Sequence, residues 1–118
     1  MEKIDSLDSL RERLAAFVEE RDWDQFHNPK NLAMALAAEA GELLEHFQWL
    51  TQEQARQLEA STRDEVAHEL ADILMFLVRL SDKLDIDLLD AARSKLEQNR
   101  DKYPVEKSRG RATKYNKL

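Results

Sequence analysis

Apolar residues recur every three to four positions along most of the chain, a spacing typical of amphipathic helices. The pattern predicts four helices, over about residues 6–20, 28–50, 61–84 and 87–102. Residues that begin helices stand at each predicted start: Ser6, Asn28 with Pro29, Ser61 or Thr62 in capping-box spacing, and Asp87. Tyr103 and Pro104 stop the last helix.

The composition supports an all-α fold. The chain of 118 residues has two glycines and two prolines, too few for the turns of a β protein, and 42% hydrophobic residues can form a core. Four helices with short connections predict an antiparallel four-helix bundle. The third helix carries Ile73–Val78, an uninterrupted apolar run, so we expect it to lie at the centre and also to form a subunit interface.

Acidic residues occupy unexpected positions on the second and third predicted helices. At about 100° per residue, Glu39 projects between Leu32, Leu36 and Leu43, and Glu42 lies at the margin of the same stripe. Glu69 and Asp72 repeat this arrangement on the apolar face of the third helix. A bundle would bring these four carboxylates into one region.

Converging buried carboxylates repel each other and lose solvation, so a positive partner is needed. Few lysines or arginines lie on those faces. Mg²⁺ prefers carboxylate oxygens and keeps coordination positions for phosphate groups. The four acids therefore predict a magnesium site for phosphate chemistry.

Other interpretations of the acids stay open. One acid near an apolar stripe is commonly a boundary residue whose carboxylate reaches water. Di-iron bundle proteins use Glu-x-x-His on two helices, but here only Glu65-x-x-His68 fits, which makes oxygen chemistry a distant alternative. From spacing alone, the histidines are surface or supporting residues rather than ligands.

Charge is distributed unevenly along the chain. Residues 104–118 contain five basic residues and one acid, a charge of +4, which leaves −10 for residues 1–103. An acidic body disfavours binding to a nucleic acid polymer. We therefore expect a helical domain over 1–103 and a basic C-terminal tail over 104–118. Because the longest apolar run has six residues and the first ten residues lack a signal-peptide pattern, we expect no membrane association and a cytoplasmic location.

Aromatic and polar residues outside the acids are candidates for ligand contacts. Trp23 and Trp49 bracket the second predicted helix and can either stack on a nucleobase or close the ends of a core. Lys95, Asn99 and Lys102 form a ridge on the fourth helix that is either a solvated face or a phosphate-binding surface.

Three segments together resemble a known family. RDWDQFHNPKNLAMALAAEAGELLEHFQW, DEVAHELADILMFLVRLSDKLDIDL and KLEQNRDKYP resemble the MazG-like nucleotide pyrophosphohydrolases, in particular the branch that contains the dCTP pyrophosphatases. The resemblance covers nearly the whole chain, and the motif Glu-x-x-Glu followed by Glu-x-x-Asp carries it.

The resemblance implies an all-α enzyme that uses Mg²⁺ to convert a nucleoside triphosphate to the monophosphate and pyrophosphate. It implies a pyrimidine deoxynucleotide substrate such as dCTP or a modified form. The metal ligands would be Glu39, Glu42, Glu69 and Asp72, and Glu39 or Glu42 would also orient or deprotonate the attacking water. Trp23, Trp49 and His27 would lie at the base, and Lys95, Asn99 and Tyr103 at phosphates or sugar. The family also implies a homotetramer built from two dimers.

Two other functions are compatible with the sequence. The chain can be a relative that binds nucleotides without hydrolysing them, or a structural helical oligomer whose acids pair with the basic tail. Metal binding coupled to nucleotide binding separates the structural role from the other two.

Overall fold

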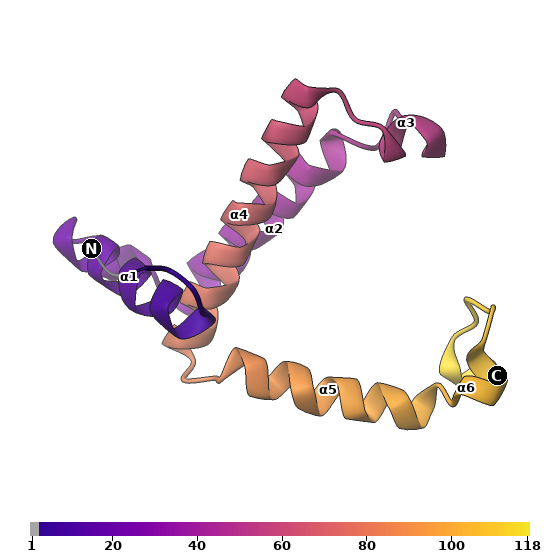
Figure 1. Cartoon of the computed structure of the whole chain (residues 1–118). Coiled ribbons are helices and arrows are strands. Elements are labelled where there is room, and N and C mark those ends of the chain that lie inside the picture. The colour runs from indigo at the N-terminus through magenta and orange to yellow at the C-terminus, as the bar shows by residue number, and fades with distance from the viewer. Residues whose placement is uncertain (1–2) are drawn as a thin grey trace. The chain divides into compact units, whose positions relative to one another are not determined.

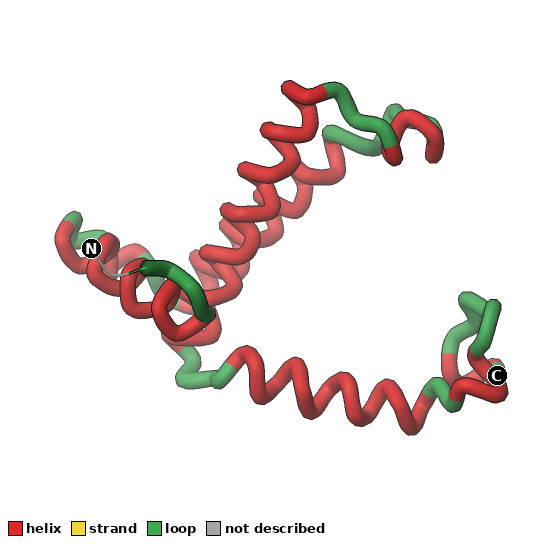
Figure 2. The backbone as a smooth tube through the Cα atoms, viewed as in Figure 1, coloured by secondary structure: helices red, strands yellow, loops and turns green. Residues whose placement is uncertain are grey.

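A computed structural model describes residues 3–118, and all its regular elements are helical (Figures 1 and 2). The all-α class is therefore confirmed. The chain divides into two compact units, one extending to Ile86 and the other beginning at Asp87. No helix in the range 3–118 combines the length and the apolar character that a membrane crossing requires.

The first unit is built on one pair of long helices. Its helices are α1 (Leu7–Glu20), α2 (Pro29–Glu45), α3 (Gln52–Arg56) and α4 (Ala60–Lys83), with a short 3-10 helix at Asp24–Phe26. α2 and α4 run antiparallel side by side, and α3 lies in the connection between them (Figure 1). α1 packs against the C-terminal part of α4.

Three of the predicted helix starts are confirmed. Ser6 caps α1 in a reciprocal pair with Ser9, Asn28 accepts from the backbone N–H of Asn31, and Asp87 accepts from that of Asp90. Pro29 occupies the first turn of α2, where its missing N–H costs no helical hydrogen bond.

Two predicted boundaries are wrong. α2 ends at Glu45 rather than Leu50, because the chain turns through residues 46–50 before Thr51 and Gln54 form a capping box that starts α3. α4 begins at Ala60 after Glu59, so Ser61 and Thr62 lie inside its first turn and cap nothing.

The core of the first unit is small. Among the described residues, the buried hydrophobic side chains are Val18, Leu32, Val66 and Val78, contributed by α1, α2 and α4. Apolar side chains remain exposed on α4, where Leu70, Leu74 and Leu77 follow at helical spacing with exposed fractions of 52%, 40% and 36%. This stripe, which extends from the apolar run toward the start of α4, is left uncovered by the single chain.

The second unit holds α5 (Leu88–Lys102), α6 (Val105–Ser108) and a 3-10 helix at Tyr115–Lys117. α5 ends at Lys102, as Tyr103 and Pro104 predict. The basic segment folds back locally: the ring of Tyr115 meets that of Tyr103 edge-on with centroids 6.1 Å apart, and the Lys102 ammonium lies 4.8 Å from the Tyr115 ring. Since α5 belongs to this second unit, the four-helix bundle and the boundary at 103/104 stay predictions.

Leu32 provides a test of the α2–α4 packing, because its side chain is 2% exposed. Leu32→Ala should lower the free energy of unfolding by about 3 kcal/mol, since it removes buried methyl groups and leaves a cavity. Ile4→Ala, at a side chain that is 50% exposed, should cost less than about 1 kcal/mol. Equal losses in urea unfolding would contradict this packing.

Candidate functional site

Three of the four predicted acids meet where α2 and α4 pack together. One carboxylate oxygen from each of Glu39, Glu69 and Asp72 lies within 4.8 Å of the other two. Glu39 comes from α2, and Glu69 and Asp72 come from α4, where a separation of three residues places both on one face. All three side chains are half-buried.

Two oxygens of this cluster have no hydrogen-bond donor. Glu39 Oε2 and Glu69 Oε2 are buried and unpartnered. A hydrogen bond between the protonated Glu39 carboxyl and Glu69, together with burial and the neighbouring Glu42 and Asp72, raises the pKa of Glu39 from 4.5 to about 7. In the absence of a cation, the Glu39 carboxyl therefore takes up a proton more readily than an ordinary glutamate.

Glu42, the fourth predicted ligand, lies beside the cluster and is exposed. Its carboxylate is close enough to Glu39 to contribute to the raised pKa of that residue. It also lines an open pocket with Glu45, His46, Glu65, His68 and Glu69. Solvent and ligands can therefore reach the Glu69 side of the cluster.

His46 lies beside the acid cluster, as a supporting residue rather than a predicted ligand, and the sequence interpretation did not name its partners. Its Nε2 lies 3.8 Å from Glu69 Oε1, and its Nδ1 lies 3.6 Å from Glu65 Oε2. His46 follows α2 directly, whereas its partners are on α4. It thus stands at the second oxygen of Glu69, opposite the unpartnered one.

The donor set fits a hard divalent cation. Carboxylate oxygens are the preferred ligands of Mg²⁺, and a cation would supply the partner that the two buried oxygens lack. No thiolate ligand is available, because the chain has no cysteine. The geometry therefore allows metal binding by Glu39, Glu69 and Asp72, with Glu42 adjacent.

The two tryptophans lie at opposite ends of α2. Trp23 is edge-on to Phe17, with ring centroids 5.8 Å apart, and Trp49 is 84% exposed. α2 has 17 residues, so its ends are about 25 Å apart. Within one chain, Trp23 and Trp49 are therefore too far apart to stack on the same nucleobase.

Three predicted substrate contacts belong to the second unit. Lys95 is exposed and Asn99 half-buried on α5, and Tyr103 follows that helix. Their roles at phosphates or sugar stay predictions.

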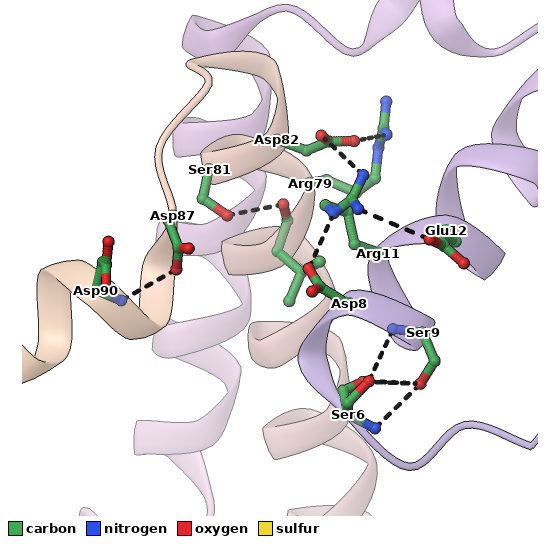
Figure 3. A network of polar contacts seen from close by, with 11 residues as sticks. Ser6, Asp8, Ser9, Arg11, Glu12, Arg79, Ser81, Asp82, Asp87 and Asp90 are labelled. Carbon is green, nitrogen blue, oxygen red and sulfur yellow. Dashed lines mark hydrogen bonds and ion pairs between the residues drawn. The ribbon is translucent and has the colours of Figure 1, made fainter.

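His27 lies in a polar network around Arg79, which the sequence interpretation also missed. Arg79 is 5% exposed on α4, and its Nε–H donates to His27 Nδ1 at 3.3 Å. Its two terminal nitrogens donate to Asp24 Oδ1 at 3.3 Å and Asp82 Oδ2 at 3.4 Å. Arg11 of α1 approaches Asp82 at 3.7 Å (Figure 3).

No local pattern marks Arg79 as a buried residue, because two of its partners are remote in the sequence. Asp24 and His27 lie 55 and 52 residues before Arg79, so no local spacing reveals the contact. The three nitrogens of Arg79 bond to His27, Asp82 and Asp24 rather than to the acid cluster. The carboxylates remain without a cationic side chain at their unpartnered oxygens.

Comparisons with known proteins agree on one family. The profile of the MazG-like family matches residues 34–118. The chain is 45% identical over 115 residues to dCTP pyrophosphatase 1 of Bos taurus, covering 96% of this chain and 68% of the bovine protein. It is 42% identical to dCTP pyrophosphatase 1 of Homo sapiens with the same coverage.

A solved structure gives the same result for the fold. The crystal structure of a pyrophosphatase from Archaeoglobus fulgidus matches with a TM-score of 0.79 and 34% sequence identity. The match covers 88% of this chain and 97% of the archaeal chain.

The raised pKa of Glu39 predicts how stability depends on pH. Between pH 4.5 and about 7, folded Glu39 keeps a proton that the unfolded chain has lost, so metal-free stability should fall as the pH rises through this window. Mg²⁺ should raise the melting temperature more at about pH 8 than at about pH 6, because fewer protons must be displaced.

Thermal unfolding with EDTA or Mg²⁺ measures this effect. Glu39→Gln should reduce both the pH dependence and the Mg²⁺ response, whereas Glu97→Gln, at a side chain that is 70% exposed on α5, should change neither. An identical Mg²⁺ response in Glu39→Gln and the unsubstituted protein would argue against this cluster as the metal site.

Proposed function

The chain belongs to the MazG-like family, and we propose that it is a metal-dependent nucleoside triphosphate pyrophosphohydrolase. Its reaction converts a (d)NTP and water to the (d)NMP and pyrophosphate. The substrate is a pyrimidine deoxynucleotide such as dCTP or a modified form, in line with the names of the bovine and human relatives. We place the enzyme in the cytoplasm.

The carboxylate cluster is the observation that carries this proposal. Two buried oxygens without donors, on Glu39 and Glu69, are unfavourable unless a cation or a proton occupies the site. A structural ion pair between the acids and the basic tail is the alternative, and it predicts no metal binding coupled to nucleotide. A site for Mg²⁺ and the phosphates of a nucleotide accounts for the cluster directly.

In this proposal, Glu39, Glu42, Glu69 and Asp72 hold Mg²⁺. When bound, the ion supplies charge neutralisation for the triphosphate. Glu39 and Glu42 are the candidates for accepting a proton from the attacking water. The raised pKa of Glu39 belongs to the metal-free cluster, because a bound cation favours the ionised carboxylate, so this pKa does not select between the two residues.

The remaining residues recognise the nucleotide. Trp23 and Trp49 would stack on the base, and their separation along α2 is best met by one tryptophan from each of two chains. His27 would lie at the base on the Trp23 side. Lys95, Asn99 and Tyr103 would contact phosphates or sugar, with lysine supplying charge and asparagine a directional donor.

A homotetramer built from two dimers completes this arrangement. The exposed stripe of Leu70, Leu74 and Leu77 on α4 and the small core of the described chain favour burial against a second copy. An assembly of this kind would also supply the second tryptophan.

Hydrolysis should depend on the α4 acids. Glu69→Gln and Asp72→Asn should each lower kcat/KM for dCTP on the order of a hundredfold or more, because each removes a charged metal ligand. Pyrophosphate release from canonical and modified NTPs and dNTPs, with Mg²⁺ or EDTA, measures this loss and ranks the bases. Reaction in ¹⁸O-labelled water should place the label in the monophosphate.

Glu97→Gln is the matched control on α5 and should keep full activity. Absence of pyrophosphate release from every nucleotide would reject the enzyme assignment. Calorimetry would then separate the alternatives, since a nucleotide-binding protein binds Mg²⁺ together with nucleotide and a structural oligomer does not.

The oligomeric state can be tested at the α4 stripe. Light scattering should give a tetramer for the unsubstituted protein, and Leu74→Glu should give smaller species because it buries a charge at the interface. Ser94→Glu, an exposed position on α5, should leave the tetramer intact. A stable monomer of the unsubstituted protein would contradict the assembly.

A further inference from the structure

We propose that Arg79 is a positioning residue that holds His27 as the neutral tautomer with its proton on Nε2, so that His27 presents a hydrogen-bond donor to the nucleotide. This inference deepens the proposed function and rests on it for the identity of the ligand. The tautomer itself follows from the contacts of Arg79 and does not depend on hydrolysis.

The chemistry of arginine fixes the direction of the hydrogen bond. A guanidinium only donates, and it stays charged at any physiological pH. Arg79 Nε–H points at His27 Nδ1 across 3.3 Å, so Nδ1 must be the unprotonated nitrogen that accepts. In a neutral imidazole the proton then resides on Nε2.

Arg79 is itself held in one orientation. Asp24 and Asp82 accept from its two terminal nitrogens, and the side chain is 6% exposed. Lys83 bonds Asp24 at 2.7 Å, and Arg11 approaches the other oxygen of Asp82. With both flanking carboxylates engaged, the Nε–H has His27 as its acceptor and cannot turn to another group without breaking two ion pairs.

The groups around His27 also disfavour its charged form. Burial and the positive charge of Arg79 lower the pKa of His27, and Lys83 acts in the same direction, whereas Asp24 opposes them. The outcome is a pKa below the ordinary value of 6.5. His27 is therefore neutral at pH 7, with a single donor.

Among the hydrogen bonds of residues 3–118, the His27 ring takes part through Nδ1, which leaves its Nε2–H for a ligand. Arg79 follows Asp72 by seven residues on α4, which places it on the same face about 10 Å along the axis. That offset suits a ligand whose phosphates meet the acids and whose base lies at His27. Pyrimidines offer ring and carbonyl acceptors, such as N3 and O2 of cytosine, to such a donor.

The tautomer can be measured on the full chain without metal or nucleotide. Histidine ¹⁵N–¹H correlation spectra at about pH 7 should show Nδ1 of His27 as an unprotonated nitrogen and Nε2 as a protonated one. His46 and His68 serve as internal references, and His27→Gln identifies the signal. A proton on Nδ1 of His27, or a mixture of both tautomers, would overturn the proposal.

Substitutions then test the role of Arg79. Arg79→Met should give a mixture of tautomers and raise the pKa of His27, because it removes both the donor and the charge, and Arg79→Lys should recover part of the effect. Arg11→Met is the control, since Arg11 shares Asp82 but does not contact His27. If Arg79→Met does not fold, the unsubstituted protein and Arg79→Lys still decide the tautomer.

Kinetics tests the contact with the nucleotide. Arg79→Met should raise the KM for dCTP about tenfold with kcat changed less than about threefold, as expected for loss of a binding hydrogen bond. Arg11→Met should keep both constants. If Arg79→Met loses the single tautomer of His27 but keeps the KM for dCTP, the contact between His27 and the nucleotide is overturned. If the unsubstituted protein hydrolyses no nucleotide, the proposed function is rejected and the tautomer result still stands.

Discussion

The mutual repulsion of Glu39, Glu69 and Asp72 is the constraint on which the rest of the structure depends. Their oxygens lie within 4.8 Å of one another on half-buried side chains, and two of these oxygens have no donor. The antiparallel packing of α2 and α4, which carry the buried Leu32, Val66 and Val78, must therefore hold the acids together against their charge. A proton on Glu39 relieves part of this repulsion, and a divalent cation would relieve more, so the packing energy is used to maintain a site that favours cation binding.

The small core limits how much repulsion a single chain can tolerate. A few buried aliphatic side chains on three helices contribute little, and the stripe of Leu70, Leu74 and Leu77 remains open to solvent. Covering that stripe with a second copy would add apolar burial on the same helix that carries Glu69 and Asp72. Assembly and formation of the acid site would then be coupled, because both would depend on the position of α4.

Local sequence signals predicted the helices and the acid cluster, whereas contacts between distant residues were missed. Asn28 with Pro29 and Asp87 act through hydrogen bonds three residues away, so spacing alone identifies them. Ser61 and Thr62 have the same spacing but lie inside α4, since Glu59 already begins the helix. Arg79 follows an apolar run and has the pattern of a surface arginine, because its partners Asp24 and His27 come from a segment more than fifty residues earlier.

Charged side chains on one face of α4 are treated in two opposite ways, without partners at one point and fully hydrogen-bonded at another. Near Glu69 and Asp72 the negative charge lacks partners, which leaves the site ready for a ligand that brings its own cation. About two turns further, Arg79 is bonded on every nitrogen, which leaves its charge satisfied and its neighbour His27 uncharged. A nucleotide with bound metal has a matching arrangement, because its charge lies at the phosphates and its neutral hydrogen-bonding groups lie at the base. In the proposed enzyme, this distribution of charge along α4 would favour one orientation of the nucleotide, with its phosphates at the acids.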